Sequence, residues 1–166
     1  MSIEFAPSDL ARLARCATQS SIEARCQAFV EALWPTLSCA GASWAGFYLD
    51  QPDAPADARL VLGPREPKPA CSPIGVHGAC GRSLLSRSIL VVRDVASLGA
   101  GYVACDPRDR SELVLPCLRE DGSAWGVFDL DSHDVACFSE SDGRVLWSAL
   151  DMAGLTTSEP VRILVV

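Results

Sequence analysis

Residues 8–39 carry apolar side chains at the intervals of three and four residues that are typical of amphipathic helices. These apolar positions are Leu10, Leu13, Ala14, Ala17, Ile22, Cys26, Phe29, Val30, Leu33, Trp34 and Leu37. We predict two helices within residues 8–38. Ser20 and Glu23 form a capping-box pair at the expected start of the second helix. Pro35 indicates that this helix ends nearby.

From residue 43 the pattern changes to short aromatic and β-branched runs separated by turn residues, which is typical of strands. The predicted strands are residues 43–50, 59–62, 89–93, 112–118 and 124–131. Asp121-Gly122 separates the last two strands and predicts a hairpin with a type I′ turn, in which both central residues have positive φ. We therefore expect these two strands to be antiparallel neighbours.

Two long stretches, residues 63–78 and 96–110, show neither pattern. A short helix is predicted between them at residues 81–87. An amphipathic helix at residues 139–153 closes the pattern, and Gly154 suits its end. Irregular segments of this length in a compact domain more often belong to a site than to a plain connection. We therefore expect the two long loops to carry the functional site.

Helices at both ends of an antiparallel set of strands predict an α+β domain. We expect one domain over residues 1–155, with the sheet and its loops at residues 43–132. The N- and C-terminal helices should pack on one face of a central antiparallel sheet, and the long loops should cover the other. Residues 156–166 form a tail with an apolar end. The sequence leaves open whether this tail adds an edge strand, joins a partner chain or is poorly ordered.

The composition fits a single folded domain and excludes several classes of protein. With 166 residues, of which 49% are hydrophobic and 21% charged, the chain can bury one core of ordinary size. Its net charge of −7 and the lack of a Lys/Arg cluster argue against nucleic acid and anionic lipid as partners. No apolar stretch reaches the roughly 18 residues of a membrane span, and the N-terminus lacks the order of a signal peptide. We expect a cytoplasmic protein.

Eight cysteines are the unusual feature of the composition. Because persistent disulfides are rare in the cytoplasm, these cysteines are buried side chains, metal ligands or redox groups. Cys71, Cys80 and Cys105 lie in or beside the two long loops. The other five, expected to be core or peripheral residues, are Cys16, Cys26, Cys39, Cys117 and Cys137. No Cys-x-x-Cys pair occurs and the histidines are only His77 and His133, so we expect no metal. Thiol redox chemistry and ordinary buried thiols remain open alternatives.

Acidic and aromatic residues gather on the predicted strands. Asp129 and Asp131 are two apart, so their side chains share one face of the sheet, and Glu112 on the neighbouring strand could join them. Clustered carboxylates in a cleft shift one another's pKa, which suits proton donation or the binding of an ammonium group. Trp44 and Tyr48 also share a face. The alternatives are a strand end that reaches solvent, for the acids, and core packing, for the aromatic pair.

Seven short segments occur in an order that carries a more specific indication. They are Trp44-Ala-Gly-Phe-Tyr48-Leu, Leu62-Gly-Pro with Lys68-Pro-Ala-Cys71, Gly78-Ala-Cys80-Gly81, Val92-Arg-Asp94-Val95, Ala104-Cys105-Asp106, Ser111-Glu112-Leu-Val114-Leu-Pro116 and Gly126-Val-Phe-Asp129-Leu-Asp131-Ser132. This order resembles that of the GAF-domain free methionine-(R)-sulfoxide reductases, over residues 20–152 of the chain.

The resemblance implies a GAF domain that reduces free L-methionine-(R)-sulfoxide to L-methionine without a cofactor. It implies that Cys105 is the nucleophile, which becomes a sulfenic acid and then forms a transient disulfide with Cys71 as the resolving thiol. Cys80 would be an auxiliary thiol. The resemblance further implies recycling by thioredoxin and a homodimer.

The same resemblance assigns the substrate-binding residues. Trp44 and Tyr48 would hold the S-methyl group, and Glu112, Asp129 and Asp131 would hold the amino group and the sulfoxide oxygen. A rival hypothesis is a non-catalytic GAF domain that binds a small ligand as a sensor.

Overall fold

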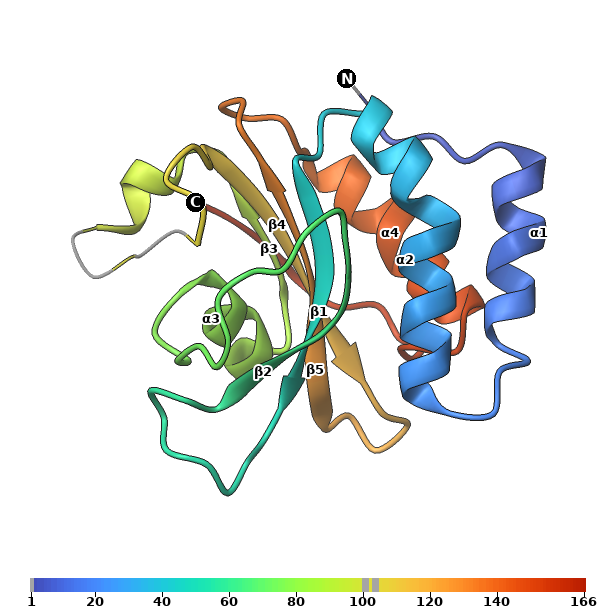
Figure 1. Ribbon diagram of the computed structural model, residues 1–166, viewed down its shortest axis with the longest axis horizontal. Coiled ribbons are helices and arrows are strands. Elements are labelled where there is room, and N and C mark those ends of the chain that lie inside the picture. Colours follow the sequence, from blue (N-terminus) through green and yellow to red (C-terminus); the bar gives the residue numbers. More distant parts are fainter. Residues whose placement is uncertain (1, 100–101, 103–104) are drawn as a thin grey trace.

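The structure is a computed structural model that describes residues 2–99, 102 and 105–166 (Figure 1). Its elements are α1 (Pro7–Cys16), α2 (Ile22–Cys39), β1 (Trp44–Asp50), β2 (Leu60–Glu66), α3 (Ala79–Ser86), β3 (Ile89–Val92), the 3-10 helix η1 (Val95–Leu98), β4 (Ser111–Leu118), β5 (Ala124–Ser132), α4 (Glu140–Met152) and β6 (Ile163–Val165). The strands form one sheet in the order β2-β1-β5-β4-β3-β6. All neighbouring strands are antiparallel except β3 and β6, which are parallel.

The sheet separates two unequal hydrophobic clusters. Helices α1, α2 and α4 cover one face, where the rings of Phe29, Phe47 and Phe128 pack at centroid distances of 4.8–5.8 Å (Figure 1). Helix α3 and the loops cover the other face, over a smaller cluster that includes Tyr48 and Leu84. The predicted α+β arrangement, with terminal helices on one face and long loops on the other, is confirmed. Of the helices in the described part of the chain, none has the length and apolar character needed to cross a membrane.

Helix α2 differs from the prediction at both ends. Ser21, not Ser20, is its N-cap residue, because the Ser21 hydroxyl accepts the backbone N–H of Ala24, in the first turn, at 3.1 Å. Pro35 does not end the helix, which continues to its last residue, Cys39. A proline removes one hydrogen bond from a helix. The next turn persists because it carries Leu37, which is fully buried beneath the sheet.

The stretch 63–78, expected to be irregular, holds more structure than predicted. Residues 63–66 extend β2, and Ile74 pairs with Leu60 in an isolated bridge. Pro64 is tolerated in β2 because this is an edge strand and its register against β1 shifts nearby. Helix α3 begins at Ala79, so Cys80 lies in the first turn of a helix and not in a loop. These pairings join distant segments and leave no local pattern in the sequence.

The predicted hairpin between β4 and β5 is confirmed, but its turn is not type I′. Gly122 has a φ of +78°, whereas Asp121 does not have a positive φ. The Gly122 N–H donates to the Arg119 carbonyl at 2.8 Å, which describes a tight turn followed by a glycine in the left-handed region. The Asp121 carboxylate instead accepts the Ser123 N–H. Only the glycine has to adopt a positive φ in this arrangement.

The tail supplies β6, which resolves the alternatives that the sequence left open. Ile163, Leu164 and Val165 pair in parallel with β3. Backbone hydrogen bonds continue the pairing, from the Ile89 N–H to the Arg162 carbonyl and from the Val166 N–H to the carbonyl of Val91. The tail therefore forms one edge of the sheet.

The N-terminal segment is fixed to α4 by one buried carboxylate. Asp142 accepts the Ile3 N–H at 2.7 Å through one oxygen, and the N–H and hydroxyl of Ser139 at 2.8 and 2.6 Å through the other. Asp142 is 1% exposed, so these donors have no access to water in its absence. The same residue therefore caps α4 and holds the segment that precedes α1.

We expect Asp142→Ala to lower the free energy of unfolding by about 2–4 kcal/mol, because it leaves buried donors without an acceptor. Asp151→Ala, on an exposed position of the same helix, is the matched control and should change it by less than about 0.5 kcal/mol. Chemical denaturation of both variants measures the difference. Equal stability of the two variants would contradict this account of the N-terminal segment.

Candidate active site

Three acidic side chains lie together on the loop-covered face of the sheet. Glu112 on β4 pairs directly with Asp131 on β5. Asp129 lies two residues before Asp131 on the same strand, so its side chain is on the same face. All three are 5–9% exposed. The alternative of a strand end that reaches solvent is therefore wrong. Because β5 is buried on both faces, the structure places these carboxyl groups inside the domain.

Because they are buried, these acids keep their protons to a higher pH than ordinary carboxyl groups do. It raises the pKa of Glu112 and of Asp131 well above the usual range, and the neighbouring Asp129 charge adds to both shifts. Burial also raises the pKa of Asp129, to about 7. The Cys80 thiol donates to one Asp129 oxygen at 3.2 Å, and the other oxygen has no hydrogen-bond partner in the described part of the chain. The cluster therefore holds protons near neutral pH and offers an unused acceptor.

The aromatic pair on β1 holds a strap of backbone over this face. The rings of Trp44 and Tyr48 lie 6.0 Å apart, and both residues are buried. The Trp44 indole N–H donates to the Lys68 carbonyl, and the Tyr48 hydroxyl donates to the Cys71 carbonyl, each at 2.9 Å. Gly46 lies between them, where a Cβ atom would meet the Trp44 ring at 2.5 Å. We call residues 67–73 the strap. The two side chains pack like core residues, but their polar atoms position the strap.

Cys71, which belongs to the strap, and Cys105 both lie beside the Tyr48 hydroxyl. The Cys105 sulfur lies 4.0 Å from the Tyr48 hydroxyl, whose donated hydrogen bond goes to Cys71. Cys105 is exposed as a residue, yet partial burial of its sulfur raises its pKa to about 12, with a further contribution from the hydrogen bond to the Cys71 thiol. Burial likewise raises the pKa of Cys80 well above its usual value. All three sulfur atoms belong to free cysteines. Both Cys80 and Cys105 are therefore neutral thiols in this state.

One cavity of about 320 Å³ brings these groups together. Seven of the eight predicted site residues line it, namely Tyr48, Cys71, Cys80, Cys105, Glu112, Asp129 and Asp131. Trp44 lines an adjoining hollow of about 50 Å³, which shares Ala70 and Cys105 with the cavity. The cavity lies at the lower end of the range for small-ligand pockets, about 300–1,000 Å³. Its size suits a small molecule.

Three further residues of the cavity wall were missed by the sequence reasoning. Asp57, His77 and Tyr102 also line the cavity. Asp57 belongs to the β1–β2 hairpin loop, which reaches the cavity because the Val76 N–H donates to the Ala56 carbonyl. None of the three residues belongs to a spacing pattern. His77 and Tyr102 lie in the two long segments that were predicted to carry the site, and this was the one available indication.

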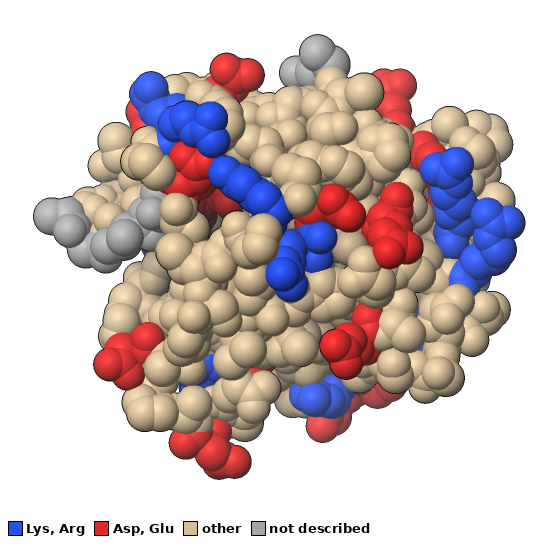
Figure 2. Space-filling view, viewed as in Figure 1, with Lys and Arg blue, Asp and Glu red and all other residues tan. Residues whose placement is uncertain are grey.

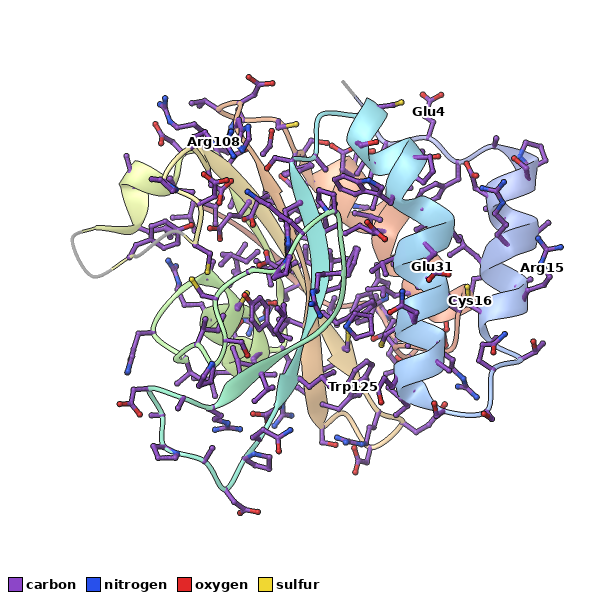
Figure 3. The ribbon with its side chains drawn as sticks, in the orientation of Figure 1. Glu4, Arg15, Cys16, Glu31, Arg108 and Trp125 are labelled. Carbon is purple, nitrogen blue, oxygen red and sulfur yellow. The ribbon has the colours of Figure 1, made fainter. Side chains whose placement is uncertain are left out.

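The remaining five cysteines lie outside the cavity. Cys16, Cys26 and Cys117 are buried, as expected for small core side chains. Cys39 is exposed and Cys137 is half-buried. In Figure 3, Cys16 lies on the helical side of the molecule and Arg108 lies beyond the sheet at the other side. The predicted separation is therefore confirmed: Cys71, Cys80 and Cys105 line the cavity and the other five cysteines do not. Cys80 lies at the start of a helix.

A second acidic cluster lies at the rim of the cavity. The Asp106 carboxylate pairs with Lys68 at 2.6 Å and with Arg108 at 2.7 Å, and these bonds hold its pKa well below the usual range. Asp106, Asp109 and His133 have ligand atoms within 4.8 Å of one another, as do the three buried acids. Two cations already neutralise Asp106, and the buried acids retain protons, whereas a metal requires deprotonated ligands. Neither cluster fits a metal ion well. On the face drawn in Figure 2, basic and acidic side chains are intermixed.

No family model matches the chain. The chain is 37% identical over 105 residues to the free methionine-R-sulfoxide reductase of Saccharomyces cerevisiae. These matched residues cover 63% of this chain and 57% of the relative. It spans about three fifths of the length of the curated relatives that it matches first.

Two solved structures cover nearly the whole chain. A GAF protein from Burkholderia vietnamiensis is 33% identical, with a TM-score of 0.72 and coverage of 89% of this chain and 91% of the other. The free methionine-R-sulfoxide reductase of Neisseria meningitidis, solved in complex with its substrate, is 28% identical, with a TM-score of 0.76 and 92% of both chains covered. The sheet and its loop-covered cavity thus define a GAF domain. The chain therefore belongs to the GAF-domain family, and within that class it is similar to free methionine-R-sulfoxide reductases.

The raised pKa of Asp129 predicts how stability depends on pH. An unfolded aspartate titrates near pH 4, so between about pH 4 and pH 7 the folded state retains a proton that the unfolded state has lost. The free energy of unfolding therefore falls as the pH rises through this window. Asp129→Asn removes this titration. The free energy of unfolding of the variant, minus that of wild type, should therefore be about 1–3 kcal/mol larger at pH 8 than at pH 4.

Denaturation curves at several pH values measure this difference. Asp134→Asn, an exposed position just beyond β5, serves as the control and should follow the wild-type slope. Parallel pH profiles for wild type and Asp129→Asn would show that Asp129 is ionised in the folded state throughout the window.

Proposed function

We propose that this protein reduces free L-methionine-(R)-sulfoxide to L-methionine, with Cys105 as the nucleophile and Cys71 as the resolving thiol. The observation that carries the proposal is the single cavity in which this pair of thiols meets three buried acids. Relatives named for the same reaction support it. A free amino acid with a short thioether side chain is compatible with the size of the cavity.

The cavity wall offers partners for both charges of a free amino acid. Glu112, Asp129 and Asp131 supply acceptors for an α-ammonium group, and one Asp129 oxygen has no partner among the described residues. The N-terminus of α3 borders the same cavity, and its N-cap residue, Gly78, has no side chain to satisfy the first backbone N–H groups. Such groups attract a carboxylate. A methionine sulfoxide residue within a peptide lacks both charges, so the site selects the free amino acid.

The proposed reaction has two thiol steps. The Cys105 sulfur attacks the sulfoxide sulfur, and a protonated acid of the cluster donates a proton to the oxygen as the S–O bond breaks. The released water oxygen then bonds to the Cys105 sulfur as the bond between the two sulfurs breaks, so that methionine leaves and Cys105 becomes a sulfenic acid. The Cys71 thiol then attacks that sulfur, which forms the disulfide and releases water. A dithiol reductant returns both cysteines to thiols.

Cys80 has a supporting place in this scheme. Its thiol donates to Asp129 and stays protonated because it is buried beside that acid. In the reduced state it orients the Asp129 carboxyl group. We propose that it acts as an auxiliary thiol, which can exchange with the disulfide only after α3 and the strap separate.

The proposal also includes partners and location. Thioredoxin is the proposed reductant, a homodimer is the proposed assembly, and the cytoplasm is the proposed location, where the reaction would counter oxidative stress. No nucleic acid or membrane partner is proposed, in keeping with the acidic composition of the chain.

Activity is tested by coupling the protein to thioredoxin, thioredoxin reductase and NADPH. Free methionine-(R)-sulfoxide should cause NADPH consumption, and Cys105→Ser should lower kcat/KM by at least about 1,000-fold because the nucleophile is lost. Cys39→Ser, the matched control, removes an exposed cysteine outside the cavity and should keep wild-type activity. Tight binding of the sulfoxide without turnover by the wild type would favour the ligand-binding sensor.

Selection of the free amino acid is tested with N-acetyl-methionine-(R)-sulfoxide. Acetylation removes the ammonium charge, so kcat/KM should fall by about 100-fold or more relative to the free substrate. Glu112→Gln should narrow this preference, because it removes one of the acids that face the ammonium group. Steady-state kinetics with both substrates measures the ratio. Equal kcat/KM values for the two substrates in the wild type would refute the assigned role of the acids.

A further inference from the structure

We infer that Lys68 is a positioning residue for the resolving step: its ion pair with Asp106 holds the strap that carries Cys71 against the loop that carries Cys105. The inference deepens the proposed function and rests on its two thiols. Lys68 lines the hollow that adjoins the cavity and does not need to touch the substrate.

The sequence positions of the two charges make the ion pair a direct link between the cysteines. Lys68 lies three residues before Cys71, and Asp106 follows Cys105 directly. The Lys68 ammonium lies 2.6 Å from an Asp106 carboxylate oxygen, across 38 residues of sequence. A change in this contact therefore moves the two sulfur atoms relative to each other.

Apart from the hydrogen bond between Cys71 and Cys105 themselves, the other side-chain hydrogen bonds of the strap in the described part of the chain join it to the sheet. Trp44 and Tyr48 hold the carbonyls of Lys68 and Cys71 on β1. The Ser72 hydroxyl accepts the N–H of Leu62 on β2 at 3.0 Å. Among the described residues, the Lys68–Asp106 pair is the ionic bond that fixes the strap to the loop of residues 105–109.

The Cys105 loop is ordered internally by a different cation. Arg108 donates to both Asp106 oxygens, at 3.0 Å through Nε and 2.7 Å through Nη2. Arg108 lies only two residues from Asp106 and projects at the edge of the molecule (Figure 3). Arg108 orients the Asp106 carboxylate but does not bond to the strap. Arg108 is therefore a matched control for Lys68: both pair with the same carboxylate, but only Lys68 connects the two loops.

The two chemical steps depend differently on this link. Formation of methionine leaves the oxygen on Cys105 and does not involve the Cys71 sulfur. The next step joins the two sulfurs at about 2.05 Å, forms the S–S bond and releases the oxygen as water. Disulfide formation therefore requires the strap to stay close, whereas methionine release does not. Lys68 is half-exposed, so salt should weaken its ion pair and slow the second step alone.

The experiment separates the steps by rapid mixing of the reduced protein with free methionine-(R)-sulfoxide. Lys68→Met should release methionine within about twofold of the wild-type rate but form the disulfide about five to ten times more slowly, with more sulfenic acid trapped by dimedone. Lys68→Arg should restore the wild-type rate. Arg108→Met should leave the disulfide rate unchanged. Added salt should slow disulfide formation in wild type and not in Lys68→Met.

Hydrogen peroxide provides a readout that does not need the proposed activity. It oxidises the Cys105 thiol to sulfenic acid with release of water, and the same disulfide step follows. If the wild type makes no methionine, the proposed function fails, and the peroxide rates still test Lys68. Equal disulfide rates for wild type and Lys68→Met with peroxide would overturn the inference. Equal slowing in Lys68→Met and Arg108→Met would also overturn it, because the effect would then belong to the Asp106 charge and not to the link.

Discussion

The burial of three carboxyl groups side by side on one sheet face is the constraint on which the rest of the site depends. An isolated carboxylate removed from water is costly, and such a group either finds a partner or keeps its proton. Among the residues that the structure describes, the one hydrogen bond that reaches the cluster from another side chain is donated by Cys80. Glu112 and Asp131 therefore have raised pKa values. The aromatic core on the opposite face, around Phe47 and Phe128, keeps the strands in place despite this unfavourable burial.

The cover over the acids depends on side chains that combine an apolar ring with one polar atom. The carbonyl groups of Lys68 and Cys71 are partly shielded from water, and protein structures avoid leaving such groups without partners. Trp44 and Tyr48 each fill space beside the cavity and satisfy one such carbonyl. Burial raises the pKa of the Tyr48 hydroxyl far above its usual value, so it remains a donor throughout the physiological range. The two aromatic residues therefore set the position of Cys71 as well as the shape of the wall.

Local patterns predicted the parts of the molecule that depend on short-range geometry. The alternation of side chains along a strand placed Asp129 and Asp131 on one face, and the register with β4 then brought Glu112 beside them. The same patterns failed where long-range contacts decide the outcome. Pro35 stays inside α2 because of tertiary burial, and the pairing of β6 with β3 joins segments that are far apart in sequence. The contact between Lys68 and Asp106 likewise has no period or motif from which it could be predicted.

The protonation state of the reduced site links recognition to chemistry. With a pKa of about 12, the Cys105 thiol has very little thiolate at neutral pH, so the proposed reaction requires it to lose its proton as the substrate binds. An incoming ammonium group favours ionised carboxylates and lowers the pKa of the acid cluster. The acids then release a proton, and the sulfoxide oxygen is the acceptor that the reaction requires. The resulting carboxylates can in turn accept the Cys105 proton. In the proposed reaction, the charge that marks the ligand as a free amino acid therefore also starts the proton transfer, and a ligand without it meets acids that hold their protons.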